Sequence, residues 1–225
     1  YHFDNLILLD VAYITIKGNH DSMTRTDLRE AISSLLALAV KEGFIERTKG
    51  GFQFTHDKLK AAFQSMLGTE EADQLHWLAG EAYLKRGDNF DAATHLNAAA
   101  GFLNDREQRI KLMRINSKAA KYCIDKLAFA MAATFLRTGL QLLDEDAKWS
   151  EELHDMTFEM TESLARIELI VGNFDACKEA TAETLRRARS VEAQINSLLI
   201  GVEVRMASNE VDESITTANR ALKTL

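Results

Sequence analysis

The chain has 225 residues, of which 46% are hydrophobic, and a formal net charge of -7 at pH 7. This length allows one domain of ordinary size plus a smaller one, with enough apolar residues to bury a core. The chain contains no proline, where average usage would give about 11, so turn-rich sheet and extended linkers are excluded over most of its length. The longest apolar runs, such as 35–40, are far shorter than the ~20 residues that cross a bilayer, so we expect no membrane partner.

Charge is distributed unevenly along the chain. Residues 1–68 hold 8 Lys/Arg and 8 Asp/Glu, whereas residues 69–225 hold 19 and 26. Sequence-independent binding to a phosphate backbone needs clustered cations, so we expect no nucleic-acid partner. Cys123 and Cys177 stand on predicted helix faces among apolar residues, which is typical of buried thiols in a reducing compartment. We therefore expect a cytoplasmic protein, and the absence of an initiator Met at Tyr1 leads us to expect a piece of a longer one.

The first 68 residues predict a small domain of three helices and a hairpin. An apolar helix is expected over 5–16, and a second helix from a cap at Thr26 to a stop at Gly43. Apolar and polar residues then alternate over 44–47 and 52–55, on either side of a turn that contains two glycines. A third helix begins at residue 58. This order of helix, helix, hairpin and helix is typical of a winged-helix domain, which we assign to residues 1–68.

From residue 70 onward we find helical periodicity, and alternate helices repeat. Aligning their first apolar residues gives Phe90, Leu127, Phe174 and Val211, which are separated by 37, 47 and 37 residues. Three residues after each anchor stands a small side chain, namely Ala93, Ala130, Cys177 and Ser214. Small residues at a fixed position let paired helices approach closely. This spacing indicates a tetratricopeptide-like repeat.

The repeat predicts four helical hairpins at about 71–103, 105–143, 149–189 and 191–225. The ten extra residues of the third period fall around 143–149, where we expect an acidic loop followed by a capped helix. Hairpins of this kind stack neighbour on neighbour into a superhelix. The predicted fold is therefore mainly α, with the winged-helix-like domain followed by an α-α superhelix of about eight helices over 69–225.

Two stretches resemble a known family. The segment Thr55-His56-Asp57, where the hairpin meets a helix, resembles the element that closes the winged helix of STAND-type NTPase switches. The ordered elements His95-Leu96-Asn97, Arg106-Glu107, Ala119-Ala120-Lys121, Gly139-Leu140-Gln141-Leu142-Leu143 and Trp149 resemble the region after the AAA-type ATPase module of large hybrid histidine kinases and related serine/threonine kinases. The resemblance covers roughly 25–190. The Walker motifs, phosphotransfer helix and kinase ATP lid of that family are absent from these residues, so the resemblance carries no enzyme activity to them.

The resemblance implies a role for His56 and Asp57. In related switches a histidine at this position reaches the phosphates of the ADP that the preceding NTPase domain holds, so His56 would sense nucleotide and Asp57 would hold the geometry of the helix start. The family's cofactor, ATP or ADP, would bind the parent protein rather than this segment. The alternative is that His56 or Thr55 caps the helix and Asp57 is ordinary first-turn charge.

The leading interpretation is a non-catalytic regulatory and scaffolding segment. It would couple an upstream NTPase domain to downstream signalling domains, and a protein ligand could bind the repeats. One alternative is a protein-binding adaptor, and another is an ATP-dependent transcription regulator whose winged helix binds DNA. Against the latter, the predicted helix after Thr26 carries Arg29 and Lys41 but also Asp27, Glu30 and Glu42. No metal site is expected, because no histidine has another ligand at metal-binding spacing, and the run 186–189 reads as a helix C-terminus.

Overall fold

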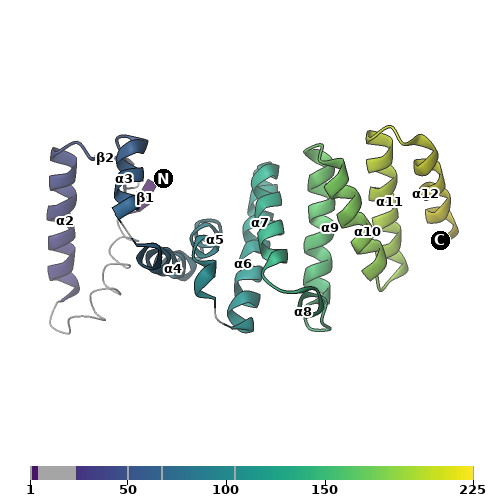
Figure 1. The fold of residues 1–225 in the computed structure, drawn as a ribbon, viewed down its shortest axis with the longest axis horizontal. Coiled ribbons are helices and arrows are strands. Elements are labelled where there is room, and N and C mark those ends of the chain that lie inside the picture. The colour runs from purple at the N-terminus through teal and green to yellow at the C-terminus, as the bar shows by residue number, and fades with distance from the viewer. Residues whose placement is uncertain (1, 5–23, 50, 67, 104, 225) are drawn as a thin grey trace. The chain divides into compact units, whose positions relative to one another are not determined.

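The computed structural model describes residues 2–4, 24–49, 51–66, 68–103 and 105–224, and its ribbon is shown in Figure 1. The described chain is mainly helical with a small sheet, which confirms the predicted class in its coarse form. It divides into two compact units, Tyr1–Asn104 and Asp105–Leu225. The first helical hairpin therefore belongs to the same unit as the sheet.

Helix α2, Arg25–Lys41, opens the helical part of the first unit. Its N-cap is Thr24, whose hydroxyl accepts a hydrogen bond from the backbone N–H of Asp27 at 3.2 Å, while the Asp27 carboxylate accepts one from the Thr24 N–H at 3.1 Å. This capping box satisfies two N–H groups that the helix itself leaves unpaired. The helix thus starts before the predicted cap at Thr26, which was wrong by two residues.

A small antiparallel sheet follows α2. Strands β2, Ile45–Arg47, and β3, Gly51–Phe54, form the predicted hairpin, in which Glu46 lies opposite Gln53. Strand β1, His2–Asp4, which was not predicted, pairs with the other edge of β3, so the strand order is β1-β3-β2. The helix predicted over 5–16 lies outside the described residues. The winged-helix arrangement therefore stays a prediction.

Three helices complete the first unit. Helix α3, Asp57–Met66, begins directly after the sheet. Helices α4, Thr69–Lys85, and α5, Asn89–Ala98, form the first helical hairpin, which ends in the short 3-10 helix η1, Ala100–Phe102. Gly80 lies where the two helices cross, because a Cβ at this position would stand 2.5 Å from the Leu96 side chain. The predicted hairpin at 71–103 is confirmed.

The second unit is a succession of three helical hairpins. They are α6 with α7, α9 with α10, and α11 with α12, and their bounds are Arg106–Asp125, Phe129–Gln141, His154–Ile170, Phe174–Arg187, Val191–Ala207 and Val211–Thr224. Helix α7 packs on α9, and α10 packs on α11, so each hairpin buries its apolar face against the next. In Figure 1 the turns inside these hairpins lie at the upper ends of the helices.

All four hairpins turn in the same way. The second residue after the first helix has a positive φ in each case: Gly87, Leu127, Gly172 and Asn209, with values between 59° and 81°. The next N–H donates to the carbonyl five residues earlier at 2.8 to 3.1 Å, and the second helix begins one residue later. This is the Schellman motif, which satisfies carbonyls that the end of a helix leaves unpaired. The recurring turn gives each hairpin one common register.

That register corrects the predicted alignment. Leu127 was expected to begin a helix, but it is the left-handed turn residue itself, and the helix begins at Phe129. Phe90 is the second residue of α5, whereas Phe174 and Val211 begin their helices as predicted. The left-handed residues are 40, 45 and 37 residues apart, so the 37-residue period holds for the last pair. In the correct register the buried small residues are Ala92, Ala132, Cys177 and Ser214.

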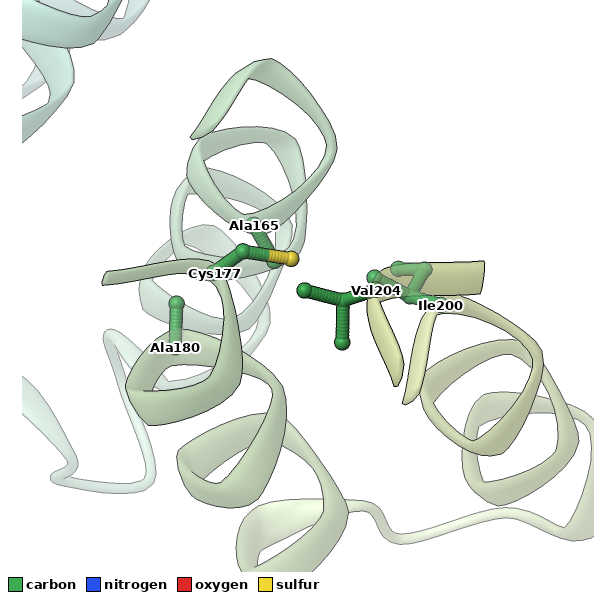
Figure 2. Packing of buried hydrophobic residues seen from close by; sticks show 5 residues of the cluster. All are labelled: Ala165, Cys177, Ala180, Ile200 and Val204. Carbon is green, nitrogen blue, oxygen red and sulfur yellow. The ribbon is translucent and has the colours of Figure 1, made fainter. Parts of the chain in front are cut away.

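These small residues allow helices of one hairpin to meet those of the next. Figure 2 shows Cys177 on α10 beside Ala165 of α9, with its sulfur directed toward Val204 of α11. At Gly139 of α7, a Cβ would lie 2.7 Å from the Met160 methyl carbon of α9. The core of the second unit therefore depends on close approach, and larger side chains at these points would separate the helices.

The extra residues before the third hairpin, which the prediction counted as ten, fold locally within a turn-to-turn distance of 45 residues. Residues of the predicted acidic loop form the one-turn helix α8, Glu145–Lys148, capped by Asp144. Trp149 follows and is buried. The next helix, α9, begins at His154 rather than near residue 149, and its N-cap, Leu153, makes no side-chain cap. The expected start and cap of this helix were therefore wrong.

Candidate functional site

The predicted nucleotide-sensing residues lie where β3 passes into α3. Thr55 holds this junction in place, because its hydroxyl donates to the carbonyl oxygens of Gly43 at 2.7 Å and Phe44 at 3.2 Å. The Thr55 hydroxyl hydrogen is thus directed at the chain between α2 and β2 rather than at α3. The His56 carbonyl accepts a hydrogen bond from the Leu59 N–H at 3.0 Å, which forms the first turn of the helix. The junction is fixed by backbone and threonine contacts.

His56 and Asp57 are both exposed on this junction. Among the described residues, the His56 imidazole makes no hydrogen bond. Asp57 stands in the first turn of α3, where a carboxylate meets the favourable end of the helix dipole. The arrangement presents an exposed imidazole directly before a helix start, next to a threonine that is held by hydrogen bonds. The nucleotide contact itself stays a prediction.

A histidine pair in the first helical hairpin was not predicted. The Nδ1 atoms of His76 on α4 and His95 on α5 are 3.0 Å apart, and Tyr83 stacks on the His95 ring with centroids 5.5 Å apart. Burial, assisted by the nearby His76, lowers the pKa of His95 to about 4. His95 is therefore neutral at pH 7, and one ring can donate a hydrogen bond to the other. The signal was missed because the two residues are 19 positions apart and meet through the hairpin turn.

The described histidines form no metal-binding cluster, and the two described cysteines are buried. No group of three or more His, Cys, Asp or Glu side chains there could hold a metal ion. Cys123 and Cys177 are buried free thiols, and burial raises the pKa of both. A thiol with a raised pKa is a poor nucleophile at pH 7.

The second unit contains a buried ion pair that the sequence did not indicate. Glu168 of α9 is fully buried and pairs with Arg137 of α7, whose side chain is 42% exposed. The second carboxylate oxygen, Glu168 Oε2, has no hydrogen-bond partner among the described residues. Burying a carboxylate raises the free energy of the folded state when only one of its oxygens accepts a hydrogen bond, unless a further donor reaches the other oxygen. Two other buried polar atoms of the unit, Trp149 Nε1 and Ser150 Oγ, also lack a hydrogen-bond partner among the described residues.

The arginines at 186–189 lie at the end of α10, as predicted. Arg186 and Arg187 pair with Glu183 one turn earlier, and Arg189 donates to both oxygens of Glu151 at 3.0 and 2.8 Å. The Arg187 guanidinium also lies 5.0 Å from the centre of the Trp149 ring. These cations therefore hold the third hairpin together and are not a free basic patch.

Comparisons with known proteins returned no match to a protein-family model, a curated protein or a solved structure. Within the described ranges, no helix has the length and apolar character needed to cross a membrane.

Proposed function

We propose that this chain is a non-catalytic regulatory and scaffolding segment of a multidomain, ATP-dependent signal-transduction protein of the histidine-kinase type. The supporting observation is the stack of three helical hairpins in the second unit, which share one turn and offer successive surfaces for a protein partner. In this proposal the repeats receive or transmit a conformational signal between an upstream NTPase domain and downstream signalling domains.

The junction at His56 would link this scaffold to nucleotide. Its exposed imidazole fits a donor to the phosphates of ADP held by the NTPase domain, and the threonine contacts at the junction would keep that donor in place. The resemblance of Thr55-His56-Asp57 to STAND switches supports the same role. ATP and ADP would be ligands of the parent protein rather than of these residues.

Replacing His56 in the protein that contains this segment and its NTPase domain tests the proposal. A hydrogen bond to a charged group contributes about 1.5–3 kcal/mol, so His56→Ala should speed release of a fluorescent ADP by roughly 10- to 150-fold. Lys58→Ala, which removes an exposed cation two residues away in the first turn of α3, is the matched control. Unchanged ADP release and unchanged basal output in His56→Ala would remove His56 from the mechanism.

A protein-binding adaptor is the second candidate, and the stacked hairpins of the second unit favour it as well. An adaptor would bind its partner through this chain alone, without an NTPase domain. A regulatory segment would change its partner binding when the NTPase domain exchanges ADP for ATP. Measuring partner affinity for the isolated 225-residue chain and for the complete protein in both nucleotide states separates these two functions.

A further inference from the structure

Two cavities lie on opposite flanks of α10 in the second unit. The first, of about 280 Å³, is bordered by α7, α8, α9 and α10, and the second, of about 210 Å³, by α10, α11 and α12. The charged residues lining the first are Arg137, Glu145, Lys148, Glu168, Glu179 and Glu183, and we call it the acidic pocket. Those lining the second are Lys178, Arg205 and Arg220, and we call it the basic pocket. No described residue that lines the basic pocket is acidic.

The two pockets occupy equivalent places in successive hairpins. Counted from the left-handed turn residues Gly172 and Asn209, Glu168 and Arg205 both stand four positions before the turn. Counted from the first residues of α10 and α12, Glu183 and Arg220 both stand nine positions into the helix.

The same register relates other lining residues. Leu140 and Leu185 are both eleven positions into the helix that precedes each pocket, and Glu179 is equivalent to Thr216. Stacking of hairpins explains why a cavity recurs at this place. It does not explain why the cavity is lined by four carboxylates and two cations in one hairpin and by three cations in the next.

Some carboxylates of the acidic pocket lack a full set of partners among the described residues. Glu179 is exposed and forms no ion pair with the described residues, and Glu168 Oε2 lacks a hydrogen-bond partner among them. The other carboxylates of the pocket have cationic partners: Glu183 pairs with Arg186 and Arg187, Glu168 with Arg137, and Glu145 with Lys148. The pocket therefore has acceptor capacity left for an added cation.

The basic pocket has spare donors. Lys178 pairs with Glu210, and Arg205 donates one hydrogen bond to the carbonyl of Gly201 at 2.9 Å. A lysine has three N–H donors and an arginine five, so each of these contacts uses a part of the available set. Gly201 also leaves room for the arginine, because a Cβ there would lie 3.2 Å from the guanidinium. Glu210 interacts with both cations, so a partner carboxylate would bind through the donors of Lys178 and Arg205 that Glu210 and Gly201 leave unused.

We infer that an extended segment of a partner protein crosses α10, with a Lys or Arg side chain in the acidic pocket and an Asp or Glu side chain in the basic pocket. This inference rests on the protein-binding part of the proposed function and specifies the partner's chemistry. The pockets are separated by about one helix diameter, roughly 10 Å. An extended chain covers that distance in about three residues, so the partner motif is a cation and an anion about three positions apart.

Short labelled peptides test this inference directly. The probes are fluorescein-labelled 12-residue Gly/Ser peptides that carry Arg-x-x-Glu, the reversed order Glu-x-x-Arg, or Gln at both positions, and fluorescence anisotropy measures their binding to the whole 225-residue chain. We expect one of the charged orders to bind at least tenfold more tightly than the Gln peptide, with an affinity that falls as salt rises. The better order reports the direction of the bound chain.

A double charge reversal gives the decisive comparison. In Glu179→Lys/Arg220→Glu one charge in each pocket is reversed, which lowers the net negative charge of the acidic pocket and the net positive charge of the basic pocket, so the preference between Arg-x-x-Glu and Glu-x-x-Arg should weaken at least several-fold. The control is Arg114→Glu/Glu159→Lys, which reverses two exposed charges outside both pockets and should leave the preference unchanged. Far-UV circular dichroism verifies that each variant is folded.

Two results would overturn the inference: equal binding of all three peptides, or a preference that the double reversal leaves unaltered. Neither result bears on ADP release from His56→Ala, because that experiment depends on the other unit. Failure of the pocket assignment and failure of the proposed nucleotide coupling are therefore distinguishable.

Discussion

Removing one partner of the ion pair between Glu168 and Arg137 should destabilise the second unit strongly. Arg137→Ala would leave a fully buried carboxylate without its cation, and removing one partner of a buried pair costs about 3–5 kcal/mol. Because the arginine side chain is 42% exposed, part of its charge is already screened by water. We therefore expect the lower end of that range, about 3 kcal/mol.

The matched control is a second Arg–Glu pair on α9. Arg166 pairs with Glu162 one turn away, and their side chains are 51% and 23% exposed. Exposed pairs within a helix contribute about 0.3–0.5 kcal/mol, so Arg166→Ala should change the free energy of unfolding by less than about 1 kcal/mol. The two variants remove the same side chain from the same unit and differ mainly in the burial of the glutamate.

Trp149 provides a reporter for this measurement. The chain has two tryptophans, Trp77 in the first unit and Trp149 in the second, so Trp77→Phe leaves one fluorophore that responds to unfolding of the second unit. Urea titrations then give the free energy of unfolding for each variant. If Arg137→Ala and Arg166→Ala lose equal stability, the burial argument is wrong. Adding Glu168→Leu to Arg137→Ala should restore most of the loss, because the unpaired charge is gone.

Three further changes follow from packing, backbone geometry and titration. Gly139→Ala should cost less than about 1 kcal/mol in the same urea assay, because the Met160 methyl carbon that its Cβ would meet at 2.7 Å ends a flexible side chain and Ala is the better helix former. Gly172→Leu should lower the free energy of unfolding by about 1–2 kcal/mol, because the leucine would have to adopt a left-handed φ. Leu127→Gly removes a 75% exposed side chain from the same conformation and should change that free energy by less than about 1 kcal/mol. The folded pKa of His95 lies below its unfolded value, so on acidification the unfolded chain takes up the proton first. The free energy of unfolding of the first unit should therefore fall by about 2 kcal/mol as the pH drops from 6.5 toward 4. In Trp149→Phe, where Trp77 is the remaining fluorophore, urea unfolding measures this slope, and adding His95→Phe should flatten it.

Most helices of the second unit could be predicted, because amphipathic periodicity is a local property of the sequence. The hairpin at 191–225 was placed correctly as α11 and α12, and its 37-residue distance from the preceding hairpin was also correct. The error at Leu127 has a physical cause. Apolar residues are expected inside helices, and nothing in a leucine indicates a positive φ, which glycine or asparagine supplies in the other three hairpins.

The polar contacts of the described residues could not be predicted in the same way. His76 and His95, and likewise Arg137 and Glu168, come together across a hairpin or between hairpins. Their meeting depends on the exact register of the turn, and an error of two residues rotates a side chain by more than half a helical turn. The junction at His56 was easier to place, because a strand, a threonine and a helix start follow one another directly in the sequence.

The four hairpins also show which positions the fold constrains by size and which it leaves open to different chemistry. Three positions into the second helix, every hairpin has a small buried residue, as in Ala92, Ala132, Cys177 and Ser214. Six positions into that helix the residues are His95, Phe135, Ala180 and Thr217, which share neither size nor polarity. The position nine residues into α10 and α12 likewise carries Glu183 in one and Arg220 in the other. Helix packing therefore accounts for the small residues. The difference in net charge between the two pockets requires an explanation outside the fold, and complementary charge on a bound partner supplies one.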